Sequence, residues 1–113
     1  MPTYVRLLIP RKQAEATQVT QYTVKTGSVV VIDKFTATNT SVNNATISVN
    51  LPGNTQTPGD ANIITYTRNI APKETYTFPE LIGQVVDSEG FISTIASIAS
   101  TLTITASGRE IAQ

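Results

Sequence analysis

The chain has 113 residues, and its eight Lys and Arg residues balance eight Asp and Glu residues, so the formal net charge is zero. It contains no Cys and no His, which excludes disulfides, thiolate nucleophiles, Cys-ligated metal centres and catalytic triads built on His. Thr, Ile and Val supply 41 of the 113 residues, and these β-branched side chains favour strands over helices. The length fits one domain, and the composition indicates an all-β fold.

Residues 1–19 differ from the rest of the chain. Residues 4–9 form an apolar patch that is interrupted only by Arg6 and ends at Pro10. Residues 11–18 are polar and lack the apolar face with which a helix could bury itself. We therefore expect an extended N-terminal arm at residues 1–19, followed by a β-sandwich domain at residues 20–113. The alternative is that the arm adds an edge strand to its own sandwich.

The arm is the predicted partner interface, because an exposed apolar patch of this kind usually marks an interaction site. Four basic residues and one acidic residue lie in residues 1–26, which gives this part a charge of +3 and leaves −3 for the rest. We expect the basic side chains of the arm to meet acidic groups on a neighbouring subunit. The predicted interface consists of Tyr4, Val5, Arg6, Leu7, Leu8, Ile9, Arg11 and Lys12.

From residue 20 onward, short alternating segments are separated by turns rich in Gly, Pro and Asn. This spacing predicts a single antiparallel β-sandwich of about seven strands. A bulge is expected near Asp33 and Lys34, where the apolar alternation of the second strand is broken. The predicted strands are residues 21–24, 28–38, 46–51, 63–69, 75–78, 91–96 and 101–107, with either a strand or a short turn at residues 81–86.

Two local patterns qualify this assignment. Residues 92–102 contain apolar side chains at helical spacing, but Ser and Thr occupy the polar positions, so we favour two strands joined by a turn at residues 97–100. Gly108 is expected to permit a bend before residues 109–111. The predicted core consists of Phe35, Ile47, Val49, Leu51, Tyr76, Leu102 and Ile104.

The outward positions of the predicted strands carry short, uncharged polar side chains, most of them Thr, such as Thr36, Thr38, Thr103 and Thr105. The simplest interpretation is a solvated sheet face on which Thr side chains pair across strands. The alternative is that sister subunits cover some of these faces, since charged residues are depleted at interface cores.

No constellation of residues predicts catalysis or metal binding. Residues 87–90 contain two acids, but calcium needs about six to eight oxygen ligands and the EF-hand spacing is absent, so a hairpin turn is the better interpretation. The remaining acids are scattered without the spacing of a glycosidase pair. We expect no catalytic residue, no cofactor and no metal site.

Nucleic acid and membranes are not expected as partners. The basic residues do not form a dense stripe with interleaved aromatics, and no apolar run approaches the roughly twenty residues of a membrane span. The first residues lack the architecture of a signal peptide, so we expect synthesis in a cytosol.

Turns and strand ends between residues 20 and 111 follow a recognisable order. A Tyr-Thr-Val segment and Gly27 lead into a long strand that ends in Asn-Thr at residues 39–40. An alternating strand at residues 46–51, a loop at residues 58–62, a turn at residues 70–76 and a closing strand at residues 102–111 follow. This order resembles small β-sandwich structural proteins of tailed bacteriophages, of the capsid decoration or tail accessory type. The arm lies outside the resemblance.

The resemblance implies a non-enzymatic virion protein, most specifically a capsid decoration or cement protein that stabilises the assembled shell through multivalent contacts. Its implied partners are the major capsid protein or other virion structural proteins, with a homo-oligomer and localisation in the virion. One alternative is a phage neck, tail or fibre accessory protein. Another is a carbohydrate-binding or adhesion module that uses Tyr22, Tyr66 or Tyr76.

Overall fold

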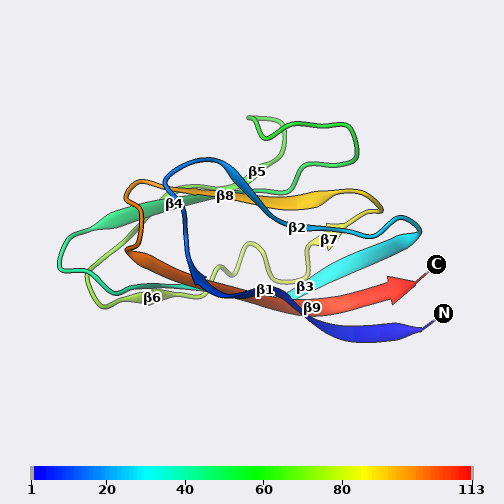
Figure 1. Ribbon diagram of the computed structural model, residues 1–113, viewed down its shortest axis with the longest axis horizontal. Helices are drawn as coiled ribbons and strands as arrows, with labels where there is room; N and C mark the ends of the chain where they lie inside the picture. Colours follow the sequence, from blue (N-terminus) through cyan, green and yellow to red (C-terminus); the bar gives the residue numbers. More distant parts are fainter. Residues whose placement is uncertain (1, 113) are drawn as a thin grey trace.

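A computed structural model describes residues 2–112, which form two facing antiparallel sheets and contain strands but no helix. Figure 1 shows the two layers along the long axis of the molecule. The predicted all-β sandwich is therefore confirmed, with nine strands in this part of the chain. They are β1 Thr3–Gln13, β2 Val19–Thr23, β3 Ser28–Asn39, β4 Ala45–Asn50, β5 Ile63–Ile70, β6 Thr75–Tyr76, β7 Val85–Val86, β8 Phe91–Ala96 and β9 Leu102–Ala112.

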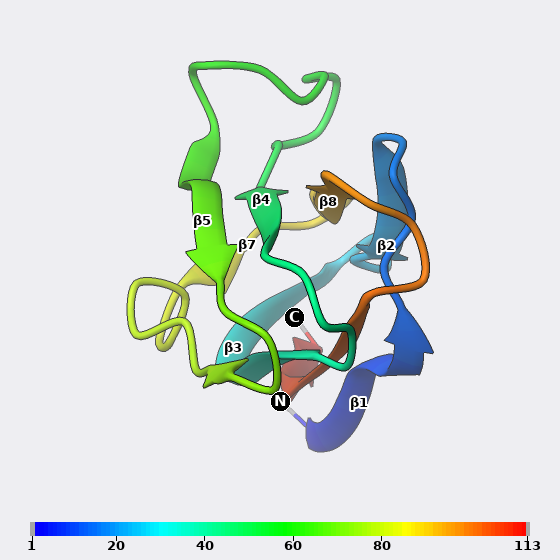
Figure 2. The ribbon, with the colours of Figure 1, turned by 90° about the vertical axis from the view of Figure 1, so that its left-hand side faces the viewer.

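The strands divide into two sheets with every pairing antiparallel. Sheet A has the order β1-β9-β3-β6, and β7 also pairs with β3. Sheet B has the order β2-β8-β4-β5. Figure 2 shows β5, β4, β8 and β2 on one side of the core and β3, β9 and β1 on the other. Since neighbouring strands in each sheet are mostly distant in sequence, tertiary packing rather than local hairpins defines the fold.

The core lies between the sheets and follows the period-two alternation of the strands. In β9, every second residue from Leu102 to Glu110 is buried. Phe35, Ile47, Val49, Leu102 and Ile104 are buried, while Leu51 and Tyr76 are partly buried and pack against them. The predicted core is thus confirmed.

The first strand differs from the expectation for this segment. β1 pairs with β9 from Thr3↔Ile111 to Gln13↔Thr103, and Leu8 and Ile9 are only 1% and 0% exposed within the common core. Residues 3–13 therefore form an edge strand of the protein's own sandwich, which was the alternative to an extended arm. We expected residues 1–12 to pack on a neighbouring subunit and not on their own domain. This expectation was wrong for Leu8 and Ile9, because two fully apolar side chains are more stable inside the core than at a surface.

Two smaller expectations had different outcomes. The bulge near Asp33 and Lys34 is confirmed by the register shift of the β3–β9 ladder between Ile32 and Lys34. The bend expected at Gly108 is wrong, because β9 continues through it to Ala112. A Cβ at residue 108 would collide with the carbonyl oxygen of Val31 and press on Leu8. Gly108 is therefore required for close approach of backbones and not for a turn.

Replacing Ile104 with Ala should lower the free energy of unfolding by about 2–5 kcal/mol, because it removes fully buried methyl groups and leaves a cavity. Thr103→Ala is the matched control, since Thr103 lies on the outer side of the same strand and is only partly buried; we expect it to cost less than about 0.5 kcal/mol. Urea unfolding followed by circular dichroism measures both, and equal costs would place Ile104 outside the core.

Replacing Gly108 with Ala should destabilise the fold by about 1–3 kcal/mol or more, because the added methyl group forces β9 and β3 apart. Gly59→Ala is the control, since a Cβ there makes only an ordinary contact with the Thr57 carbonyl. Differential scanning calorimetry compares the two melting temperatures. A Gly108→Ala protein as stable as the Gly59→Ala protein would contradict the close-approach argument.

Candidate partner-binding face

The eight residues of the predicted interface all lie in β1 but do not share one environment. Leu8 and Ile9 are in the core, whereas Val5 is 86% exposed and Tyr4 and Leu7 are about half exposed. The structure therefore separates the set into a buried part, which anchors β1 to its own domain, and an exposed part that is free to contact a partner.

Arg6 forms its salt bridge within its own chain. Its Nε donates a hydrogen bond to Glu110 Oε1 at 2.7 Å, and its guanidinium lies 5.1 Å from the centre of the Tyr4 ring. Glu110 is buried on the inner side of β9, at one end of the sandwich. The hydrogen bond from Arg6 lowers the pKa of Glu110 below its ordinary value, so the carboxylate stays charged where it is enclosed. Arg6 was expected to bind an acidic residue of a neighbouring subunit. It binds Glu110 of its own sheet instead.

Lys12 also forms a salt bridge within its own chain. Its Nζ donates to Glu15 Oε2 at 2.7 Å, and this hydrogen bond lowers the pKa of Glu15. Among residues 2–112, the salt bridges are Arg6–Glu110, Lys12–Glu15 and Arg109–Asp33. Of the three arm cations expected to face a partner, Arg11 alone forms no salt bridge within this range.

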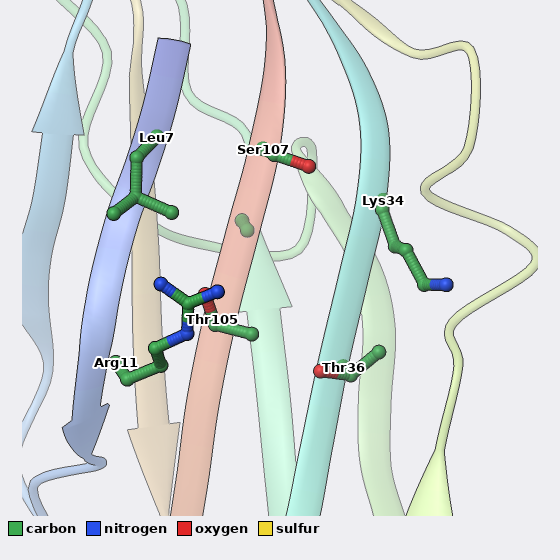
Figure 3. Close-up of a pocket in the computed structure, with 7 residues that line it drawn as sticks. Leu7, Arg11, Lys34, Thr36, Thr105 and Ser107 are labelled. Atoms are coloured by element: carbon green, nitrogen blue, oxygen red, sulfur yellow. The ribbon is translucent and has the colours of Figure 1, made fainter.

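Arg11 lies beside a shallow hollow of about 220 Å³ on the outer side of sheet A. Figure 3 shows Arg11 of β1 next to Thr105 of β9, with Lys34 and Thr36 projecting from β3 on the far side of β9. Leu7 and Ser107 line the upper part of the hollow in this view. Lys34, like Arg11, forms no salt bridge within residues 2–112. Two cations and three hydroxyl groups thus surround one depression, an arrangement that suits carboxylates of another protein.

A row of three valines and Arg109 continues from the hollow across sheet A. The register places Val5 opposite Arg109, Arg109 opposite Val31 and Val31 opposite Val85. Val5 and Val85 are more than half exposed. Arg109 donates hydrogen bonds to Asp33, from Nε to Oδ2 at 3.0 Å and from Nη2 to Oδ1 at 2.9 Å. We call this surface the sheet A face; it consists of Val5, Leu7, Arg11, Val31, Lys34, Thr36, Val85, Thr105, Ser107 and Arg109.

Half of the sheet A face could not be located from the sequence. Lys34 and Val85 are far from Arg11 along the chain, and the antiparallel ladders alone place them on one surface. The one available signal was the run of uncharged Thr residues at outward positions, for which a covered sheet face was the alternative interpretation. Such a face can bind a partner through apolar contact and charge.

Residues 2–112 contain no group of three or more acidic, His or Cys side chains arranged to hold a metal ion. They also contain no helix that is long and apolar enough to cross a membrane.

Comparison with known proteins supports the fold assignment. No protein-family model matches the chain, and a comparison with curated proteins finds no match. A chain in the structure of infectious bursal disease virus Gx strain superposes with a TM-score of 0.50 at 11% identity, covering 96% of this chain and 32% of that chain. A chain in the structure of the Gt strain gives a TM-score of 0.37 at 12% identity, covering 96% and 30%.

The match to the Gx strain structure defines the class of this protein by its fold. The protein is an antiparallel β-sandwich of the kind found in a chain of the Gx virus structure, and it spans about a third of that chain's length. At this level of identity the likeness is one of fold alone.

Replacing Glu110 with Gln tests the Arg6 contact through its pH dependence. The folded-state pKa of Glu110 lies below the unfolded value of about 4.3. The contact therefore stabilises the fold fully above that value and is lost as pH falls through the folded-state pKa. We expect Glu110→Gln to melt at a lower temperature than the parent at about pH 7, and the difference to shrink as the pH falls below the unfolded-state pKa of about 4.3. A difference that stays constant over this range would show that ionised Glu110 contributes nothing.

Proposed function

We propose that this protein is a non-enzymatic virion structural protein and, more specifically, a capsid decoration or cement protein that binds the assembled shell through the sheet A face. The observation that carries the virion role is the match of nearly the whole chain to the fold of a chain in a virus structure. The resemblance of the strand and turn order to small phage sandwich proteins supports the same role. Sister copies and the major capsid protein are the proposed neighbours.

The sheet A face supports the mode of attachment. It combines exposed Val5, Leu7 and Val85 with Arg11 and Lys34, which form no salt bridge within residues 2–112. Specific protein interfaces bury about 800 Å² per partner, which is about a seventh of the 5786 Å² surface of the described chain. One face of a sandwich of this size is therefore sufficient for a specific contact.

Multivalency accounts for stable decoration by a small protein. A single shallow face with two exposed cations binds with modest affinity, because exposed ion pairs contribute only about 0–1 kcal/mol each. Copies that touch one another on a shell raise each other's effective concentration and so bind with much higher avidity. This reasoning also predicts that shell binding weakens as the salt concentration rises.

Charge reversal on the sheet A face tests the proposal. We expect Arg11→Glu and Lys34→Glu each to weaken binding to purified shells that lack this protein by about tenfold or more, measured by co-sedimentation, because repulsion replaces attraction. Lys73→Glu is the matched control, since Lys73 is exposed in the turn before β6 and its change alters the net charge equally. Binding that is unchanged in both sheet A variants would exclude this face.

Copy number in purified virions tests the placement separately. Hundreds of copies by quantitative mass spectrometry would support the shell, whereas a number near a dozen would place the protein at the neck or tail. A protein absent from virions, with no binding to shells, would overturn the virion role itself.

A further inference from the structure

A second hollow lies on the outer side of sheet B, on the opposite side of the sandwich from the sheet A face. It has a volume of about 280 Å³ and lies beneath the loop that joins β4 to β5. We call it the Tyr66 groove. Its lining includes Gln18, Ser48, Asn50, Asp60, Tyr66 and Ile95.

One wall of the Tyr66 groove is fixed without any ligand. Asn50, which is 3% exposed, donates both amide hydrogens into the loop, to the Gly59 carbonyl at 3.0 Å and to Asn62 Oδ1 at 2.8 Å. Asn62 Oδ1 also accepts from the Gly59 backbone N–H at 3.1 Å, and Asn62 Nδ2 donates to the Thr57 carbonyl at 2.9 Å. These four hydrogen bonds of two mostly buried amides tie the loop to β4 and rigidify it, so we expect the groove to be preformed in the fold.

The lining of the groove also includes an aromatic ring that is exposed to solvent. Tyr66 is 74% exposed. It lies beside a bulge in the β4–β5 ladder, where the register shifts between Ile47 and Val49 of β4. At this bulge the backbone N–H of Thr67 donates to Ser48 Oγ at 2.8 Å. Thr65 is buried while both Tyr66 and Thr67 are exposed, so the bulge breaks the alternation and leaves the ring at the groove.

The chemistry of the lining selects a class of ligand. Among residues 2–112, no Lys or Arg lines the groove and Asp60 is the one charged residue that does, so an anionic ligand would be repelled. The remaining polar groups are amides and hydroxyls, which both donate and accept hydrogen bonds. An exposed aromatic ring supplies an apolar platform with a polar tip. A ligand with many hydroxyls and an apolar C–H face matches these groups.

We propose that the Tyr66 groove binds a neutral saccharide, with one sugar ring packed on the Tyr66 ring and its hydroxyls bonded to Asp60 and Gln18. The volume of about 280 Å³ lies just below the range for ligand pockets, which begins at about 300 Å³, so the groove suits a small ligand of one or two sugar rings. This proposal does not depend on shell decoration, because the groove stays open when the opposite sheet is covered.

Titration of the full chain with sugars, followed by amide NMR shifts, tests this site. The probes are glucose, galactose, mannose and N-acetylglucosamine, each to about 50 mM, which detects millimolar dissociation constants. We expect shifts that cluster at β5 and the β4–β5 loop for at least one sugar. Tyr66→Ala and Asp60→Asn should each weaken this binding about tenfold or more. Tyr4→Ala is the control, since Tyr4 is a partly exposed tyrosine of sheet A.

No shift with any of the four sugars, together with no binding on an array of neutral oligosaccharides, would overturn the proposal. Binding that survives Tyr66→Ala, or shifts outside the groove, would do the same. Shifts with lysine methyl ester but with no sugar would reassign the groove to a cationic ligand, held by Asp60 and the Tyr66 ring. Unchanged shell co-sedimentation by Tyr66→Ala would show that the two sites are separate.

Discussion

The double pairing of β9 is the constraint on which the rest of sheet A depends. β9 forms ladders with β1 along one side and with β3 along the other. Gly108 permits this, because the Val31 carbonyl occupies the space where any other residue would place its Cβ. The inner residues of β9 close the core and its outer residues form the floor of the sheet A face. The same eleven residues therefore contribute both to the core and to the surface chemistry of sheet A.

The two outer surfaces of the sandwich have different chemistry although both are built from short polar side chains. On sheet A, Asp33 neutralises Arg109 while Arg11 and Lys34 form no salt bridge within residues 2–112. On sheet B, buried amides hold a loop over an uncharged floor, and Asp60 is the one charge at the groove. A chain with zero net charge thus separates cationic and weakly acidic surfaces onto opposite sides. Each surface then favours a different kind of contact.

Alternation in the sequence was sufficient to predict the sandwich, its core and the bulge at residues 32–34, because a strand with one buried face must repeat every two residues. It was insufficient for β1, where Pro10 and clustered cations hid the pattern. Pro is tolerated on an edge strand, since its missing N–H faces solvent. Arg6 and Lys12 are long enough to reach Glu110 and Glu15. The sheet A face depends on which strands are neighbours, and spacing along the chain carries no signal for that.

Pro2 and Ala112 lie side by side, joined by a backbone hydrogen bond of 3.0 Å from the Ala112 N–H to the Pro2 carbonyl. Figure 1 places both ends of the chain at one end of the long axis. A few added residues could therefore close the polypeptide into a ring. The ring could be reopened in the exposed part of the β4–β5 loop at residues 54–57 without unpairing any strand. In such a circular permutant, β9 and β1 would become successive strands of one hairpin, and the slow search that joins the two ends of the chain would become a local step.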